Sequence, residues 1–297
     1  RQAFGSPGGK SYLAPKIVEL MPPHKVYVEP FVGGGAVFYR KYPAGKEILN
    51  DKDVEIIFAN KFLRDMTLEQ FEGLKKMPWQ RTQDLFYKVK AMKPKTDLEH
   101  FYRFYYLRTG SFASGSATPN PAVYGTSVDL DKLWSVHERL QRVKLHSGDY
   151  MSMVDKYDSP DTLFYLDPPY PERSFVGDKS VFSEGELQML IERLKRIKGK
   201  FILSLGSESA KLIPKGWHIR KVRVERNLFR GDSTKGYEIL VSKTKLEKRE
   251  QPEEAPIAKI EVRRPARQLI PMGYGKNRKW NHKKPARHTT AMIGSIR

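Results

Sequence analysis

Cysteine is absent from this chain of 297 residues. Without it there is no disulfide scaffold, no thiolate ligand for zinc and no cysteine nucleophile. His137, His146 and His218 lack the spacing of metal ligands, so no metal site is predicted. No apolar run approaches the roughly 18 residues of a membrane-spanning helix, and the first residues, RQAFGSPGGK, lack the apolar core of a signal peptide. We therefore expect a cytoplasmic protein that makes no membrane contact.

Acidic residues are scarce relative to basic ones. The chain has 34 Asp and Glu against 54 Lys and Arg, a formal net charge of +20. Excess Lys and Arg most often neutralise phosphates, which favours nucleic acid as the partner, although a basic surface kept for solubility is the alternative. Hydrophobic residues make up 39% of the chain, enough for a packed core. The length predicts about two domains, or one domain with a large insertion.

Strands and helices alternate in two parts of the chain. Residues 26–30 and 47–50 are predicted as buried strands, and the glycine turn and predicted helix 36–42 between them complete a βαβ unit. After residue 128 we expect helices over 130–142 and 184–197, strands over 143–146, 162–167 and 201–205, and an edge hairpin from strands 219–224 and 237–241. This alternation predicts an α/β fold with a mainly parallel sheet covered by helices on both faces.

Residues 64–128 interrupt the alternation. Helices are predicted over 68–76, 83–92 and 98–107, followed by a loop rich in Gly, Ser, Pro and Asn. We therefore predict a catalytic domain from residues 1–63 and 129–242, with 64–128 as an inserted domain. Residues 243–297 carry 15 Lys and Arg against 5 Asp and Glu and lack apolar periodicity. They are expected to form an extended or disordered basic tail, which orders on a partner or has no role.

Two signals follow the first two predicted strands. The segment EPFVGGG, residues 29–35, contains glycines that let a backbone turn tightly and approach a ligand closely, although an ordinary strand-to-helix turn is the alternative. Asp51 ends the next strand, 18 residues after Gly33. An acid at this distance typically accepts hydrogen bonds from ribose hydroxyls, and the alternative is a cap for a helix that begins near Asp53. Together the two signals favour a cofactor that contains a nucleoside.

The sharpest signal is Asp167-Pro168-Pro169-Tyr170, directly after an apolar strand. Two prolines remove two amide donors and fix two φ angles, so the turn is rigid. The Asp167 carboxylate, the Pro168 carbonyl and the Tyr170 ring would then face the carboxyl edge of the sheet, where α/β proteins bind ligands. Two acceptors beside an aromatic face suit a planar group that bears an NH2. A stiffened turn with an incidental acid is the alternative.

With these motifs, about residues 5–242 resemble the Dam-like, α-group N6-adenine DNA methyltransferases, which use S-adenosylmethionine. Residues 7–10 are similar to the family's Gly-Gly-Lys motif, 29–35 to its Glu-Pro-Phe motif, 147–150 to the segment that contacts the cofactor's adenine, and 167–170 to its catalytic motif. Ser6 and Pro7 replace an aromatic residue that is frequent in the family, and Leu107 replaces the Asn of its Asn-Arg-Thr run. The resemblance implies a Rossmann-like methyltransferase sheet, with cofactor contacts from Gly9, Lys10, Glu29, Pro30, Phe31, Gly33, Gly35, Asp51, Asp149, Tyr150 and Asp167.

The resemblance also implies a reaction, methyl transfer to N6 of an adenine flipped out of double-stranded DNA. The lone pair of an exocyclic amine is delocalised into the ring, so two acceptors on its hydrogens would favour a pyramidal, more nucleophilic nitrogen. Asp167 would stabilise the positive charge that arrives there, and Tyr170 would replace the lost stacking. The absence of cysteine excludes methylation at cytosine C5 through a cysteine adduct. N4-cytosine methylation, methylation of an RNA base or a protein amide, and a non-catalytic DNA-binding subunit stay open as alternatives.

Candidate DNA contacts lie in two segments. The insertion offers side chains that suit phosphates or base edges, namely Arg103, Arg108, Thr109, Ser111, Ser114 and Asn120. The aromatic residues of the same segment, Tyr102, Phe104, Tyr105 and Tyr106, are predicted to be helix core. Arg223, Arg226 and Arg230 resemble a phosphate-contacting loop before the last strand, or alternatively form a solvated hairpin rim.

Overall fold

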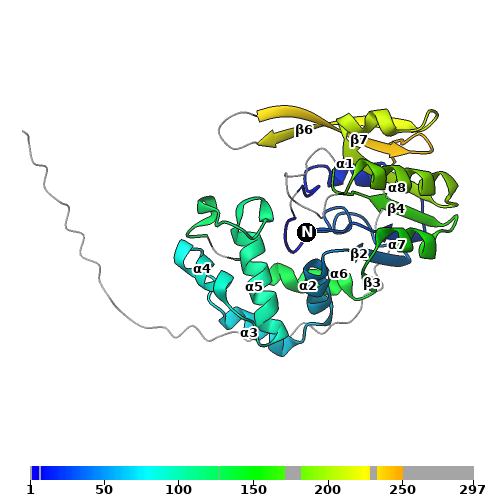
Figure 1. The fold of residues 1–297 in the computed structure, drawn as a ribbon. Coiled ribbons are helices and arrows are strands. Elements are labelled where there is room, and N and C mark those ends of the chain that lie inside the picture. The colour runs from blue at the N-terminus through cyan, green and yellow to red at the C-terminus, as the bar shows by residue number, and fades with distance from the viewer. Residues whose placement is uncertain (1, 7, 127, 171–181, 228–232, 250–297) are drawn as a thin grey trace, which may run out of the picture. The chain divides into compact units, whose positions relative to one another are not determined.

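The protein is described by a computed structural model over residues 2–6, 8–126, 128–170, 182–227 and 233–249. Residues 1–255 form one compact unit, and the elements below belong to it. Figure 1 shows their arrangement. No helix in the described ranges is long and apolar enough to cross a membrane.

The described strands form a seven-stranded sheet in the order β3-β2-β1-β4-β5-β7-β6. The strands are β1 (Val26–Glu29), β2 (Lys46–Asp51), β3 (Val143–Ser147), β4 (Thr162–Leu166), β5 (Lys200–Gly206), β6 (His218–Asn227) and β7 (Ser233–Ser242). The first five pair in parallel, and β7 is antiparallel to both β5 and β6. The predicted parallel sheet with an antiparallel hairpin at one edge is therefore confirmed. Strand order reverses between β1 and β4, the place where open α/β sheets bind ligands.

Helices cover both faces of the sheet, as Figure 1 shows. Along β1, Tyr27 points into one hydrophobic cluster and Val28 into the other, because successive strand side chains alternate between faces. The first cluster takes residues from α1 (Ala14–Glu19), α2 (Val54–Asp65) and α6 (Asp131–Leu140), and the second from α7 (Tyr150–Tyr157) and α8 (Glu184–Arg196). Burial on both faces explains why all five residues of β4 are buried.

The inserted segment folds into α3 (Leu68–Lys76), α4 (Gln83–Ala91) and α5 (Asp97–Gly110), followed by short 3-10 turns at Phe112–Ser114 and Pro121–Val123. A threonine caps each helix, at Thr67, Thr82 and Thr96, which explains why these boundaries were predictable. The aromatic residues of α5 are buried, which confirms the prediction that they are core. The separation of residues 64–128 as a domain of their own stays a prediction.

One predicted helix is wrong. Residues 36–40 form turns instead of the helix expected over 36–42. Gly35 enters the segment at a φ of +69°, and the segment ends just before Pro43, so there is room for little more than one turn. The structure also contains α1 and α7, which were not predicted, and a 3-10 helix at Ser207–Leu212. Residues 243–249, predicted as the start of the tail, belong to the unit instead: Leu246 is buried and the Arg249 amide donates to the carbonyl of Glu19. The remainder of the predicted tail lies outside the described residues.

Candidate active site

Four ionisable side chains meet at the carboxyl end of β4. The Lys10 ammonium lies 2.8 Å from Asp167 Oδ1 and 3.7 Å from Glu238 Oε2. The same ammonium lies over the Tyr170 ring, 4.8 Å from its centroid. The Tyr170 hydroxyl donates to Glu238 Oε2 at 3.1 Å and lies 3.3 Å from Ser204 Oγ. Asp167 and Tyr170, predicted as catalytic, are thus brought together with Lys10, predicted as a cofactor contact. Glu238 and Ser204 were missed by sequence reasoning.

Different elements supply these groups. Asp167 is the first residue after β4, and the next residue, Pro168, is buried while Pro169 is exposed. Lys10 lies just before α1, where its carbonyl accepts the Ala14 amide at 2.7 Å. Glu238 projects from β7, whose backbone pairs at that residue with β5 on one side and β6 on the other. The position of this acid is therefore fixed by the sheet.

Burial dominates the electrostatics of the cluster. It raises the pKa of Asp167, an effect that the Lys10 ammonium opposes and the Glu238 charge reinforces. Burial and the charge of Asp167 together raise the pKa of Tyr170 well above its usual range, so its hydroxyl stays protonated and can donate. Glu29 is also buried, and accepts the Tyr27 hydroxyl at 2.7 Å. Burial raises the pKa of Glu29 to about 8 despite that hydrogen bond.

The glycine turn after β1 is joined to Asp51. The Gly33 amide donates to Asp51 Oδ2 at 2.8 Å, and the Asp53 amide donates to Oδ1 at 2.9 Å. Gly33 and Gly35 have φ values of +48° and +69°, which other residues adopt at a cost. The cap of α2 is Asp53, so Asp51 is not the helix cap that was the alternative. Each Asp51 oxygen keeps a lone pair that could accept a ribose hydroxyl.

Gly34 makes a close approach, but to the protein itself. A Cβ at Gly34 would lie 2.7 Å from the carbonyl oxygen of Phe4. The Gly34 amide donates to Ser6 Oγ at 3.0 Å. The absence of a side chain at this glycine therefore lets the segment before Lys10 lie against the turn. Ser6, on that segment, accepts the hydrogen bond from the Gly34 amide.

Three aromatic rings lie together between the glycine turn and α7. Phe31 and Tyr150, both predicted as cofactor contacts, have ring centroids 4.8 Å apart. Phe182, which sequence reasoning missed, lies 5.8 Å from Phe31 and 5.6 Å from Tyr150. Because the first two rings touch, they offer a shared apolar surface and not two walls of a slot. Asp149 caps α7 by accepting the Ser152 amide.

Asn50 links the loops that surround the expected cofactor position. Its Nδ2 donates to the carbonyls of Pro30 and Gly148, each at 3.0 Å. The carboxyl ends of β1, β2 and β3 are thereby tied together. Asn50 Oδ1 is buried without a hydrogen-bond partner in the structure. Because Asn50 is fully buried, its role is to hold these loops in place around Asp51.

The predicted DNA contacts of the insertion make internal hydrogen bonds. Arg108 donates to the carbonyl of Ser114 and lies 3.4 Å from Asp53 Oδ2. Arg103 donates to the Lys90 carbonyl, and Thr109 to the Tyr105 carbonyl. Ser111 Oγ accepts the Ser116 amide, and Asn120 Oδ1 accepts the Ala122 amide. None of the six is fully exposed. On the hairpin, Arg223 is exposed, whereas the Arg226 side chain and all of Arg230 lie outside the described part of the chain.

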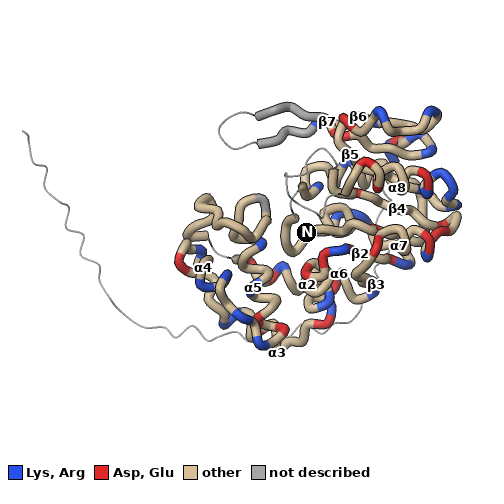
Figure 2. Tube along the Cα trace, viewed as in Figure 1, with Lys and Arg blue, Asp and Glu red and all other residues tan. Residues whose placement is uncertain are grey.

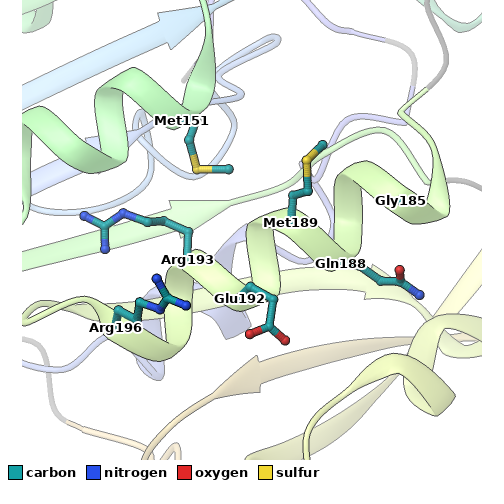
Figure 3. Close-up of a pocket in the computed structure, with 7 residues that line it drawn as sticks. All are labelled: Met151, Gly185, Gln188, Met189, Glu192, Arg193 and Arg196. Carbon is teal, nitrogen blue, oxygen red and sulfur yellow. The ribbon is translucent and has the colours of Figure 1, made fainter.

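A shallow pocket of about 410 Å³ lies on the surface of α7 and α8, where Figure 3 shows its side chains. It is lined by Met151, Gly185, Gln188, Met189, Glu192, Arg193 and Arg196. None of these is a predicted site residue. In the described residues there is also no group of three His, Asp or Glu that could hold a metal ion.

Comparison with known proteins identifies the family of this chain. The sequence pattern of the D12 class N6 adenine-specific DNA methyltransferase family matches residues 6–228. The type II methyltransferase M.MjaIII of Methanocaldococcus jannaschii is 27% identical over 282 residues, 79% of this chain and 96% of that protein. The type II methyltransferase M1.LlaDCHI of Lactococcus lactis subsp. cremoris is 26% identical over 256 residues, 77% of this chain and 89% of that protein. A solved putative methyltransferase from Streptococcus mutans in complex with SAH covers 78% of this chain and 96% of that chain, at 9% identity and a TM-score of 0.34. The chain therefore belongs to the D12 class of N6 adenine-specific DNA methyltransferases, enzymes that methylate adenine in DNA with S-adenosylmethionine as the donor.

Proposed function

We propose that Asp167, the Pro168 carbonyl and the Tyr170 ring hold the amine of an adenine flipped out of double-stranded DNA. One observation carries this assignment. In the structure the Lys10 ammonium lies within hydrogen-bond distance of Asp167 and over the face of Tyr170. A nitrogen that bears hydrogens and positive charge therefore already occupies a place bounded by the acid and the ring. An adenine amine that becomes positively charged as it reacts needs the same two partners.

The protein's own groups would act on that amine in a fixed order. Asp167 accepts one N–H, and the Pro168 carbonyl accepts the other, which favours a pyramidal nitrogen with a free lone pair. Lys10 moves away from Asp167 so that the carboxylate can accept the amine. When bound, S-adenosylmethionine supplies an electrophilic methyl group. Asp167 then stabilises the charge on the nitrogen, and its pKa, raised by burial, favours acceptance of the released proton.

For the cofactor, we propose that Asp51 binds the ribose hydroxyls and that the shared surface of Phe31 and Tyr150 supports the adenine. The lone pairs left on Asp51 and the contact between the two rings support this assignment. Asp149 caps α7 and so positions Tyr150. The remaining predicted contacts shape the same edge of the sheet: Gly9, Lys10, Glu29, Pro30, Gly33 and Gly35.

For DNA, we propose that the insertion reads the target, with Arg103, Arg108, Thr109, Ser111, Ser114 and Asn120 shaping the loops that reach it. Their internal hydrogen bonds suit a rigid surface better than long, free side chains. Exposed lysines extend from α4 into the residues after it, at Lys88, Lys93 and Lys95, and Figure 2 shows basic residues in this region. They suit phosphate contacts. Arg223, Arg226 and Arg230 are proposed to contact phosphates from the hairpin.

A methyl-transfer assay on duplex DNA tests this proposal. Wild-type protein should transfer labelled methyl to unmethylated plasmid, with N6-methyladenine as the modified nucleoside after digestion. Asp167→Ala should lower the rate by about 10²–10³-fold or more and leave DNA binding unchanged. Asp161→Ala, an exposed acid close to the opposite end of β4, should keep wild-type activity. If Asp167→Ala were as active as the wild type, Asp167 would have no role in the chemistry.

A further inference from the structure

Lys10 lies between two carboxylates in a largely buried cluster. Its ammonium is 2.8 Å from Asp167 and 3.7 Å from Glu238, and the three side chains are 6%, 17% and 8% exposed. Asp167 belongs to the catalytic motif, whereas Glu238 comes from β7, far from any motif in the sequence. A buried lysine needs one carboxylate for neutrality, so the second acid calls for a separate explanation.

The charges of the cluster supply that explanation. Counted by formal charge, two carboxylates and one ammonium sum to −1, and Tyr170 stays neutral because its pKa is raised. The charge of Asp167 also acts on Glu29, but burial is the main cause that raises the pKa of Glu29 to about 8, which favours its neutral form. With Lys10 and Asp167 alone, the cluster would be neutral. The extra negative charge at the cluster therefore comes from Glu238.

Methyl transfer places positive charge on the amine nitrogen. A site with a net charge of −1 stabilises that charge, whereas a neutral site does so only through local dipoles. Glu238 is also a second partner for Lys10. When Asp167 turns to the amine, the ammonium can move toward Glu238 without becoming an unpaired buried charge.

Glu238 makes a second contact that bears on the site. It accepts the Tyr170 hydroxyl at 3.1 Å, and Ser204 Oγ lies 3.3 Å from the same hydroxyl. These contacts hold the end of the ring against β5 and β7. A ring held at its hydroxyl end keeps a fixed plane, which stacking on a flipped base requires.

We propose that Glu238 is a positioning residue of the methyl-transfer site, which supplies its net negative charge, receives Lys10 when the substrate amine binds Asp167, and holds the Tyr170 ring. This role rests on the function proposed above for Asp167 and Tyr170. It makes the antiparallel strand β7 part of the active site.

The test compares Glu238→Gln, which removes the charge, with Glu238→Asp, which keeps it. Each variant is assayed by single-turnover methyl transfer and by calorimetric binding of S-adenosylmethionine and S-adenosylhomocysteine, which differ by a methyl group and a positive charge. Circular dichroism records folding. Glu208→Gln controls for loss of a carboxylate, because Glu208 is an exposed acid on the 3-10 helix after β5. Tyr237→Phe controls for a substitution in β7, because Tyr237 is half-exposed and adjacent to Glu238 in the chain.

Glu238→Gln should lower the single-turnover rate by about 10-fold, whereas Glu238→Asp should stay within about 3-fold of wild type. The preference for the charged ligand over the neutral one should fall by about 5-fold in Glu238→Gln only, as expected for one buried charge several ångströms away. Both controls should match wild type. Folded Glu238→Gln with a wild-type rate and preference would overturn the role of Glu238 and leave Asp167 untouched. A Glu238→Asp variant as slow as Glu238→Gln would overturn the charge argument. If the wild-type protein itself transferred no methyl group to DNA, the result would instead count against the proposed function.

Discussion

Gly34→Ala should destabilise the protein by pushing away the segment that carries Lys10. The new methyl group would lie 2.7 Å from the Phe4 carbonyl oxygen and 3.2 Å from the Gly5 carbonyl carbon, where ordinary contact begins at 3.4 Å. Both neighbours are backbone atoms, and Phe4 is fixed in the core at 3% exposure. Overpacking of this kind costs about 1–3 kcal/mol. For a unit of this size the melting temperature should fall by about 2–12 °C.

Thermal unfolding followed by circular dichroism measures this change, and single-turnover methyl transfer records the displacement of Lys10. Gly185→Ala is the matched control, because its Cβ would meet its nearest neighbour, Ser183 Oγ, at 3.7 Å, an ordinary contact. Gly185 lies in the first turn of α8, so alanine there should be neutral or slightly stabilising. If Gly34→Ala melts and reacts like wild type, the contact between the glycine turn and the N-terminal segment does not hold.

Other substitutions probe separate parts of the fold. Glu47→Gln, between buried Lys41 and Arg139, should lower the free energy of unfolding by about 3–5 kcal/mol in urea titration. Burial would raise the pKa of Glu47, but hydrogen bonds from Arg139 and attraction to Lys41 lower it. The contribution of Glu47 to stability should therefore be present above its unfolded pKa and fade as pH falls through its folded pKa. If the melting temperature of Glu47→Gln depends on pH as strongly as that of the wild type, this reasoning is contradicted. The pKa of Glu29, raised from 4.5 to about 8, should make stability fall as pH rises across that interval, by at most about 5 kcal/mol, and Glu29→Gln should flatten the slope. Replacing Lys88, Lys93 and Lys95 with Gln should reduce the slope of log affinity for DNA against log salt concentration by up to about 3. An unchanged slope would show that these lysines do not contact DNA phosphates. Deletion of residues 250–297, with 11 Lys and Arg against 4 Asp and Glu, should likewise flatten the slope, and an identical slope would show that this segment adds no phosphate contacts.

Local sequence signals were enough to predict the strands and the position of the catalytic motif. The apolar run before Asp167 and the rigid Pro-Pro turn are contiguous, so β4 and the acid at its end could be predicted from adjacent residues. Capping threonines and regular apolar spacing did the same for α3 to α5. The helix expected over residues 36–42 failed because a glycine with positive φ and a proline leave too few residues between them.

The contacts that define the site join distant parts of the chain and leave no local trace. Glu238 is a single acid in a strand, and its meeting with Lys10 depends on how β7 inserts between β5 and β6. Gly34 looked like a position for ligand approach, whereas its neighbour is the N-terminal segment. Arg108 looked suited to DNA, but its bonds to Ser114 and Asp53 depend on the folded loop.

If the insertion reads the target, as proposed above, the packing of α5 limits how this enzyme could be given a new one. Phe101 stacks on Phe62 of α2 at 4.5 Å between ring centroids, and Phe104 meets Phe4 at 5.0 Å. A chimera that exchanges residues 64–128 alone would set two foreign surfaces against Phe4 and Phe62. Because Phe4 lies on the segment that leads to Lys10, a poor fit there would disturb the proposed catalytic cluster as well as the proposed recognition segment. Grafts that keep Phe101 and Phe104 in place should tolerate change in the loops beyond them.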